Sequence, residues 1–344
     1  MSERSSVAAA GETSRAAASA VGAQSGPLAG AGDLLEVSRA ARAFPPPHPP
    51  DAVSLILDGL TLLVTDGLAA AAPALRRAVS AYAGPGITLD ESIRWGWFTQ
   101  AAASALWDDD GWRAMLVRQV ELARDVGALD QLPIMLGSLG TAVVWSGDFA
   151  AATSLIAESD AVCAATGSRA APFTAMMLAS LRGSHAEAVP LIEATTAEAA
   201  AGGQGIAVTY AHWAAAILYN GLGRYADALA AARQATEDTP GLYVSMWALP
   251  ELIEAAVGDG KPHLADEALA RLAESTRAGG TDFGLGIEAR SRALRSEGEA
   301  AKTGPMMVPN AEPAGEPTPQ PEPAPEKPAP APGEVVSLDS FRKK

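Results

Sequence analysis

The chain has 344 residues, of which 48% are hydrophobic and 19% are charged, so it can bury a substantial core as one elongated domain with tails. Its formal net charge of -15 repels a phosphate backbone, so we expect no direct nucleic-acid binding. Its single cysteine, Cys163, excludes a disulfide within one chain and a thiolate metal cluster. Aromatic residues make up only 5% of an alanine-rich chain, which favours closely packed helices over strands.

The first 33 residues are mostly Ala, Ser and Gly, and they carry too few large apolar groups to offset the entropy of ordering. We therefore expect residues 1–33 to form a disordered tail. Neither this tail nor any later stretch offers an uninterrupted apolar run of about 20 residues. The sequence thus predicts a cytoplasmic protein without a membrane partner.

Helical spacing begins at residues 34–44 and stops at a run of prolines over residues 45–50. We interpret the proline run as a rigid connection between helices, with an SH3-type ligand as the alternative. From residue 51 onward, apolar residues recur in paired helical stretches joined by turns that contain Gly or Asp. The six predicted pairs are 51–65 with 68–83, 89–107 with 111–126, 129–145 with 148–165, 170–181 with 184–200, 209–220 with 221–240, and 242–257 with 262–277.

Four turn glycines set the register of this pattern. They are 36, 40 and 37 residues apart, close to the roughly 34 residues of a tetratricopeptide repeat (Gly147, Gly183, Gly223 and Gly260). An alanine follows each glycine by five residues, where the second helix approaches its neighbour closely (Ala152, Ala188, Ala228 and Ala265). The sequence therefore predicts a right-handed α-solenoid of tetratricopeptide-like hairpins over residues 34–301. Pro73 and Pro190 lie near the starts of second helices, and we expect them within the first turn.

Residues 281–301 begin like the first helix of another pair, but no second helix follows. We expect this open repeat, around Ile287, to leave an apolar face through which the chain can form oligomers. Residues 302–332 are rich in Pro, Glu and Ala, which predicts a disordered linker. Residues 333–344 return to apolar character, which indicates either a short docking peptide or an ordinary chain end (Val335, Val336, Leu338 and Phe341).

Motifs for catalysis do not occur in the sequence. The four histidines form no His-x-x-x-His pair that would place two metal ligands on one helix face (His48, His185, His212 and His263). The nearest P-loop fragment has Pro262 where a hydroxyl residue should follow the lysine. The acidic run 108–110 supplies either magnesium ligands or the N-terminal cap of the next helix, and the cap explains it more simply. We therefore expect no metal, no cofactor and no enzymatic activity.

The tryptophans are the most suggestive set of side chains. Six of the seven lie on predicted first helices, which line the concave face of tetratricopeptide solenoids (Trp95, Trp97, Trp107, Trp145, Trp213 and Trp247). They either fill gaps between repeats or recognise a partner, and gap filling explains most of them better. The partner is expected to be a protein, a peptide or a small effector. The residues assigned to partner binding are Tyr210, Trp213, Tyr219 and Trp247.

Several stretches resemble a known family. Residues 35–67 (LEVSRAARAFPPPHPPDAVSLILDGLTLLVTDG) combine a helix, the proline connector and the first helix of the first pair, and residues 95–129 cover most of the Trp-rich second pair. Together with residues 147–162 and 286–294, they resemble the helical-repeat arm of the large ATP-binding LuxR-family transcriptional regulators, relatives of the maltose regulator. In that family a P-loop ATPase precedes the arm and a helix-turn-helix domain follows it. The sequence of this chain shows neither motif.

The resemblance implies a non-catalytic regulatory scaffold, or the effector- and partner-sensing part of a regulator, that acts by binding. The alternative is a subunit or truncated fragment of a DNA-binding regulator whose ATPase and DNA reader lie elsewhere. The first interpretation predicts that a partner binds in the groove formed by the concave face, at the residues assigned to partner binding above. The second predicts association through the open final repeat or the C-terminal residues.

Overall fold

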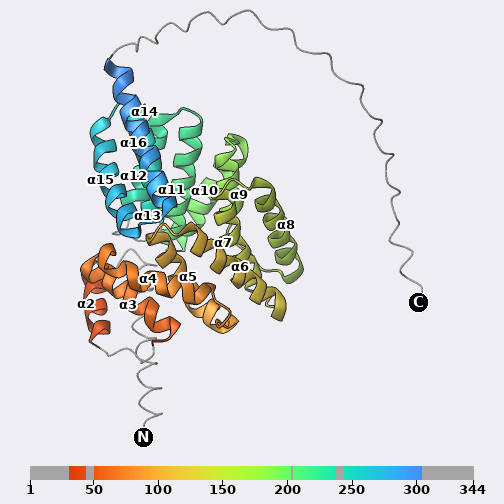
Figure 1. Cartoon of the computed structure of the whole chain (residues 1–344). Coiled ribbons are helices and arrows are strands. Elements are labelled where there is room, and N and C mark those ends of the chain that lie inside the picture. The colour runs from red at the N-terminus through yellow and green to blue at the C-terminus, as the bar shows by residue number, and fades with distance from the viewer. Residues whose placement is uncertain (1–30, 44–49, 203, 238–243, 304–344) are drawn as a thin grey trace, which may run out of the picture. The chain divides into compact units, whose positions relative to one another are not determined.

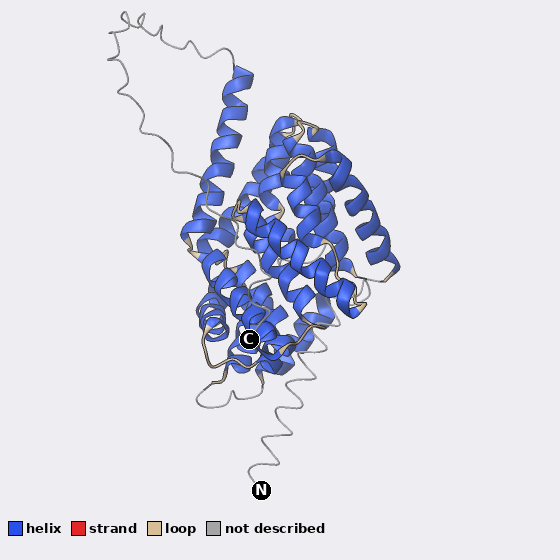
Figure 2. Ribbon diagram, turned by 90° about the vertical axis from the view of Figure 1, so that its right-hand side faces the viewer, coloured by secondary structure: helices blue, strands red, loops and turns tan. Residues whose placement is uncertain are grey.

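A computed structural model describes residues 31–43, 50–202, 204–237 and 244–303. These residues form helices and contain no strand, which confirms the predicted all-α class (Figures 1 and 2). Most of the predicted tail 1–33, the prolines at 45–49, the linker beyond residue 303 and the candidate docking peptide 333–344 lie outside the described residues. Residues 31–33, however, begin helix α2 (Ala31–Arg42), so the predicted tail is too long at this point. Alanine and an early acidic residue both suit the first turn of a helix.

The helices follow one another along the chain as neighbouring pairs, and over the described residues five of the six predicted pairs are confirmed within a few residues. Turns of one to three residues separate the two helices of each pair, so the two helices pack side by side. The pairs are α3 (Ala52–Asp66) with α4 (Leu68–Ala83), α5 (Leu89–Ala105) with α6 (Asp109–Val126), α7 (Leu132–Trp145) with α8 (Phe149–Thr166), α9 (Phe173–Leu181) with α10 (His185–Ala201), α11 (Gly205–Gly221) with α12 (Tyr225–Glu237), and α14 (Leu249–Gly258) with α15 (Pro262–Gly279).

The sixth pair departs from the prediction because its first helix is divided. The predicted helix 242–257 consists of a short α13 (Val244–Trp247) and of α14, which begins at Leu249. Pro250 occupies the first turn of α14, where its missing N–H is tolerated, but it cannot continue a helix that arrives from α13. The division places Trp247 at the end of a short helix, apart from the straight body of α14.

The two internal prolines also differ from expectation. Pro73 is the sixth residue of α4 and Pro190 is the sixth residue of α10, beyond the first turn in both cases. Both helices continue through the proline despite one lost backbone hydrogen bond. In α4 the flanking residues Ala72, Ala74 and Leu75 are buried, so packing against the neighbouring helices maintains the helix.

The turns within five of the six pairs share one backbone conformation, and the one-residue turn at Gly67 between α3 and α4 differs. The four turn glycines predicted from the sequence all have positive φ, between 68° and 83° (Gly147, Gly183, Gly223 and Gly260). The residue after the glycine donates its N–H to a carbonyl five residues earlier, as Asp148 does to Val143. In the α5–α6 turn the same position belongs to Trp107, with φ of 56°, and Asp108 donates to Ala103. Asp108 also caps α6 by accepting from the Gly111 N–H, which confirms the cap interpretation.

The core runs as one continuous apolar cluster from Ile56 to Leu272. First helices pack on first helices along part of the chain, because α7 contacts α9, α9 contacts α11, and α11 contacts α14. The last hairpin then returns to the first two: α15 packs against α4, and α13 against α5. Figure 1 shows the cyan α15 beside the orange α4.

Helix α16 (Asp282–Thr303) packs on both α14 and α15. The residue near which we expected an unpaired apolar face, Ile287, is half-buried and packed against the core. Among the residues of α16 whose side chains the structure describes, Leu285 is the exposed large apolar one. The apolar face of the last helix is therefore largely used inside this chain.

Candidate functional site

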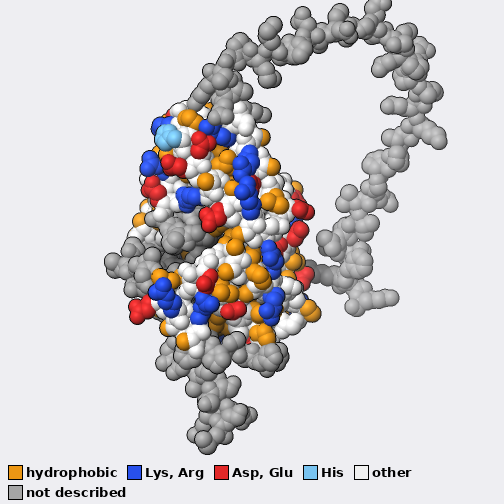
Figure 3. Space-filling view, turned by 60° about the vertical axis from the view of Figure 1, so that its left-hand side comes forward, with side chains coloured by type: hydrophobic (Ala, Val, Ile, Leu, Met, Phe, Trp, Pro, Cys, Tyr) orange, Lys and Arg blue, Asp and Glu red, His pale blue; other side chains and the backbone are white. Residues whose placement is uncertain are grey.

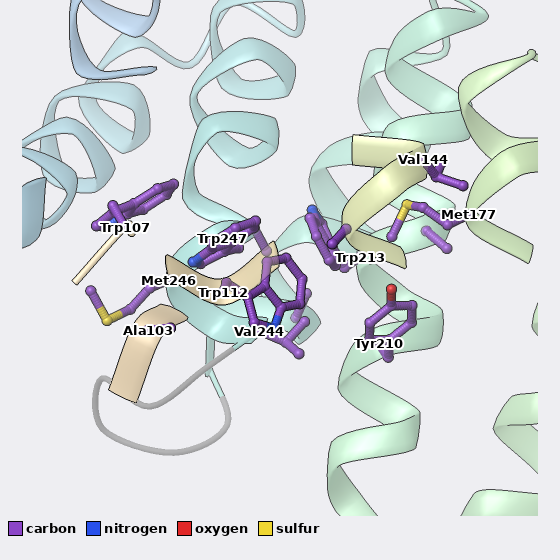
Figure 4. Close-up of a cluster of buried hydrophobic side chains, with 14 of the residues drawn as sticks. Ala103, Trp107, Trp112, Val144, Met177, Tyr210, Trp213, Val244, Met246 and Trp247 are labelled. Carbon is purple, nitrogen blue, oxygen red and sulfur yellow. The ribbon is translucent and has the colours of Figure 1, made fainter. Parts of the chain in front are cut away.

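Five tryptophans from four hairpins converge in the interior, and Figure 4 labels Trp107, Trp112, Trp213 and Trp247. Trp247 lies at the centre of this aromatic cluster, because its ring contacts Trp107, Trp112, Trp145 and Trp213 at centroid distances of 5.1 to 6.3 Å. Three further rings belong to the edge of this cluster. Phe283 contacts Trp247, Tyr210 contacts Trp213, and Phe173 contacts Tyr210. Parallel, tilted and perpendicular ring pairs all occur, so the rings pack densely.

Three of the four residues assigned to partner binding belong to this cluster and are buried. Tyr210, Trp213 and Trp247 have exposed fractions of 5%, 2% and 3%. Tyr219 lies elsewhere, half-buried, with the Arg224 guanidinium 4.5 Å above its ring. The structure thus places the first three together in the core, as the gap-filling interpretation describes. Their contact with a partner stays a prediction that would require the cluster to open.

Hydrogen bonds at the aromatic cluster connect the second hairpin to the last helices of the array. The Trp247 Nε1–H donates to the Ser104 carbonyl oxygen at 3.0 Å, and the Trp107 Nε1–H donates to Ser275 Oγ at 3.1 Å. The Thr281 hydroxyl donates to the Trp107 carbonyl oxygen at 2.7 Å. These contacts join the α5–α6 turn to α13, to α15 and to the start of α16. We call the stacked pair Trp107–Trp247 and these three bonds the clasp.

A small cavity adjoins the cluster, lined by Ser104, Trp112, Thr141, Tyr210, Trp213, Val244 and Trp247. Its volume of about 10 Å³ is room for roughly one water molecule. The Tyr210 hydroxyl donates to Thr141 Oγ1 at 3.0 Å, whereas the Nε1–H groups of Trp112 and Trp213 have no acceptor among the described residues. A small effector of ordinary size does not fit without movement of these rings.

Two buried carboxyl groups outside the aromatic core, Glu251 and Glu288, have shifted pKa values. Both are hydrogen-bonded to side chains of neighbouring helices, so their partners are those of the fold. Burial raises the pKa of Glu251, while a hydrogen bond from Asn220 Nδ2 at 2.8 Å lowers it in part. Burial would also raise the pKa of Glu288, but hydrogen bonds from Thr276 and Arg292, with the Arg277 charge, hold it below its ordinary value. Within the described ranges no three His, Cys, Asp or Glu side chains are grouped so that they could hold a metal ion.

Exposed large apolar side chains gather at one end of the second and third hairpins, a feature the sequence analysis missed. Four of the nine such residues in the described ranges lie there, with exposed fractions between 44% and 65%. We call this set the end patch: Ile93 on α5, Val126 at the end of α6, Leu129 in the α6–α7 connection and Ile134 on α7.

The packing of α5 on α6 explains why these residues share an end. A Cβ at Gly96 would overlap the Gln119 side chain, so the two helices cross closely at this pair and run antiparallel. Ile93 lies about one helical turn from Gly96 towards the start of α5, and Val126 lies about two turns from Gln119 towards the end of α6, which is the same end of the antiparallel pair. The short connection from α6 to α7 keeps Leu129 and Ile134 at that same end.

Charged side chains of both signs are interspersed over the face shown in Figure 3. No helix in the described part of the chain is both long enough and apolar enough to cross a membrane. A scan against protein-family models and a search of curated proteins find no match to this chain.

Proposed function

We propose that this chain is a non-catalytic binding module, a tetratricopeptide-like right-handed α-solenoid that serves as a regulatory scaffold in the cytoplasm and is related to the arms of LuxR-family regulators. The consecutive helix pairs and the recurring left-handed turn every 36 to 40 residues support the repeat interpretation. The residues that resemble the LuxR-family arm include α3 of the first pair, within 35–67, and most of α5 with all of α6 of the second pair, within 95–129.

The end patch is the observation that carries the proposal. Isolated exposed apolar residues are ordinary, but several large ones gathered at one end of two adjoining hairpins are typical of an interaction surface. The clasp and the continuous core hold these hairpins in a fixed frame, which lowers the entropy cost of binding. We favour a protein or peptide partner over a small effector, because the interior cavity holds roughly one water molecule.

The test is a pair of serine substitutions in the patch, Val126→Ser with Ile134→Ser. The partner is first identified by crosslinking to the full chain, then purified, and its Kd is measured directly. We expect the double variant to bind at least about tenfold more weakly, because the two most exposed apolar contacts are lost. Leu222→Ser with Leu285→Ser is the matched control, since both leucines are exposed elsewhere.

An unchanged Kd for the patch variant, with an unchanged thermal unfolding midpoint, would refute the binding role of the patch. Equal weakening in the control pair would also refute it, because the effect would then belong to exposed leucines in general. Substitution of exposed side chains should leave folding intact, so loss of affinity can be separated from loss of structure.

The alternative function is that of a subunit of a DNA-binding regulator. It is supported by Leu285 on α16, which is exposed. It predicts that the purified chain associates through this helix or through the residues after it. Light scattering on the full chain and on Leu285→Ser tests it, and a monomer in both cases at high concentration rejects it.

A further inference from the structure

We infer that the partner bound at the end patch is a basic amphipathic helix, with apolar residues along one face and Lys or Arg beside them. The inference rests on the proposed function, because it gives the chemistry of the partner at that same surface. Two properties of the end patch carry it. Its exposed side chains are aliphatic, and the charged side chains around it include carboxylates that no cation of this chain pairs.

The apolar character of the patch decides the secondary structure of the partner. A segment that lies on an aliphatic surface withdraws its backbone N–H and C=O groups from water, so these groups need other partners. A partner strand would need the edge of a sheet, but the described residues contain no strand. A polyproline segment needs a groove lined by several aromatic rings, whereas the exposed aromatic ring nearest to Ile93 on α5 is that of Trp97 alone. A helix satisfies its own backbone groups and presents an apolar stripe.

The charged residues around the patch decide the charge of the partner. The arginines near it are each paired with a carboxylate of this chain, at 2.6 to 3.7 Å (Arg94 with Asp90, Arg118 with Glu121, and Arg124 with Glu158). Two exposed aspartates form no ion pair with a described residue (Asp125, next to Val126, and Asp130, next to Leu129). The patch therefore offers two unpaired carboxylates, which favour a partner that brings Lys or Arg.

Asp125 is also unfavourable for its own helix. It lies in the last turn of α6, where the helix dipole is negative and repels a carboxylate. The neighbouring Arg124 has the charge that suits this end, but its guanidinium is bonded to Glu158 on α8. Asp125 thus costs the isolated protein some stability and gains no cation in return, and a cation supplied by the partner explains its place at the edge of the patch.

Other occupants of the patch fit these charges less well. A second copy of this chain would bring the same two unpaired carboxylates to the interface, so like charges would face each other. A nucleic acid or an anionic lipid surface is repelled by the same carboxylates and by the net charge of -15. A basic segment is attracted by both.

The probe for this inference is a synthetic peptide of about 18 residues, long enough to form a helix, built from Ala, Leu and Lys with leucine at helical spacing. Its Kd for the full chain is measured by fluorescence anisotropy. A peptide with glutamate in place of lysine, and one with the same composition in scrambled order, should each bind at least about tenfold more weakly. Equal affinity for the basic and either other peptide, or no binding of the basic peptide below about 1 mM, would overturn the inference.

The charge variant, Asp125→Asn with Asp130→Asn, tests the two carboxylates. It should bind the basic peptide about fivefold more weakly in about 50 mM NaCl and differ less in about 300 mM NaCl, because salt screens exposed charges. The matched control, Glu267→Gln with Glu274→Gln, removes two exposed and unpaired charges from α15 and should bind as the unmodified chain does. Equal weakening in both variants would overturn the inference, because the net charge of the chain would then explain it.

Thermal unfolding separates binding from structure. The midpoint of the charge variant should be unchanged or slightly higher, because Asp125 opposes the dipole of α6. A lower midpoint together with weaker binding would assign these aspartates to the fold and would overturn the inference.

The partner identified by crosslinking distinguishes this inference from the proposed function. If the patch variant, Val126→Ser with Ile134→Ser, keeps its affinity for the partner, the proposed function fails and this inference fails with it. If the patch variant loses affinity while the charge variant binds the partner with an unchanged Kd in about 50 mM NaCl, the patch is a binding surface and this inference alone fails. We expect both variants to bind the partner more weakly, the charge variant by about fivefold.

Discussion

The indole rings of Trp107 and Trp247 stack in parallel, with centroids 5.3 Å apart and planes inclined by 3°. One ring comes from the second hairpin and the other from the short helix before the last. Both Nε1–H groups find acceptors, and Thr281 donates to the Trp107 carbonyl oxygen. This stack joins the two ends of the helical array, and it does so from a backbone position where four other turns have glycine.

The first prediction concerns the left-handed backbone of Trp107. Either Trp107→Gly or Trp107→Ala removes the stack and leaves a void, with an expected loss of about 3–5 kcal/mol in the free energy of unfolding. Glycine should be the less harmful replacement by about 1 kcal/mol, because alanine keeps the strain of positive φ. Urea unfolding followed by circular dichroism measures both values.

Trp95 on α5 is the control for the predicted order of stability, in which the glycine variant at residue 107 is more stable than the alanine variant. It lies in ordinary helical backbone, half-buried, so Trp95→Ala should be more stable than Trp95→Gly by up to about 1 kcal/mol. The same order at both positions would show that Trp107 carries no backbone strain.

The second prediction concerns the close approach of α15 to the α5–α6 turn. A Cβ at Gly279 would overlap the Leu106 carbonyl oxygen, which is rigid backbone, so Gly279→Ala should destabilise the protein by about 1–3 kcal/mol. At Gly286 in α16 no atom lies within 4 Å of an added Cβ, so Gly286→Ala should stabilise it by about 0.5–1 kcal/mol. Thermal unfolding should therefore shift in opposite directions, and a stabilising Gly279→Ala would contradict the close contact.

Local chemistry explains why the helix pairs were predictable. Turn residues such as Gly147 and Asp148 act over a few positions, so the sequence shows where each helix ends. The division of α13 from α14 had a visible signal in Pro250, which the continuous apolar run around it obscured. The alignment of Trp107–Asp108 with Gly147–Asp148, 40 residues apart, was a signal for the turn that we missed, because we predicted Trp107 as the last residue of a first helix, whereas α5 ends at Ala105.

The site was less predictable because it depends on contacts between distant residues. No periodic pattern records that Ser275 and Thr281 meet Trp107, so an array that we expected to end in an open repeat instead contacts its own beginning. The same closure buries Trp213 and Trp247, which we had assigned to a groove. Conversely, Ile134 lies in a helix that is apolar all round, and only packing decides which of its faces lacks a neighbour.

The third prediction concerns Glu288, a buried residue bonded to Thr276 at 2.7 Å and to Arg292 and Arg277. These partners hold its folded-state pKa below the ordinary 4.5, so its contribution to stability is present above pH 4.5 and is lost as the pH falls through the folded-state pKa. Glu288→Gln should therefore lose about 1–3 kcal/mol at pH 7 and progressively less below pH 4.5. A loss that is independent of pH in urea unfolding would show that packing and not charge is responsible.

The fourth prediction concerns Glu251, whose pKa is shifted in the opposite direction from that of Glu288. Burial raises its folded-state pKa, so its contribution to stability is complete below the ordinary value of 4.5 and declines as the pH rises through the folded-state pKa. Asn220 Nδ2 already donates to the Glu251 carboxyl, while Asn220 Oδ1 is buried without a partner among the described residues. In Glu251→Gln the amide carbonyl oxygen can accept from Asn220 Nδ2, and the amide N–H can donate to Asn220 Oδ1.

Glu251→Gln should therefore raise the free energy of unfolding at pH 7 by on the order of 1 kcal/mol, and the gain should vanish near pH 4. Glu254→Gln is the matched control on the same helix: its carboxylate pairs with Arg290 at 2.6 Å, so the substitution should bring no gain at any pH. Urea unfolding of both variants at pH 4, 5.5 and 7 gives the comparison. A Glu251→Gln variant that is less stable at pH 7 would mean that the ionised carboxylate is the form the fold requires.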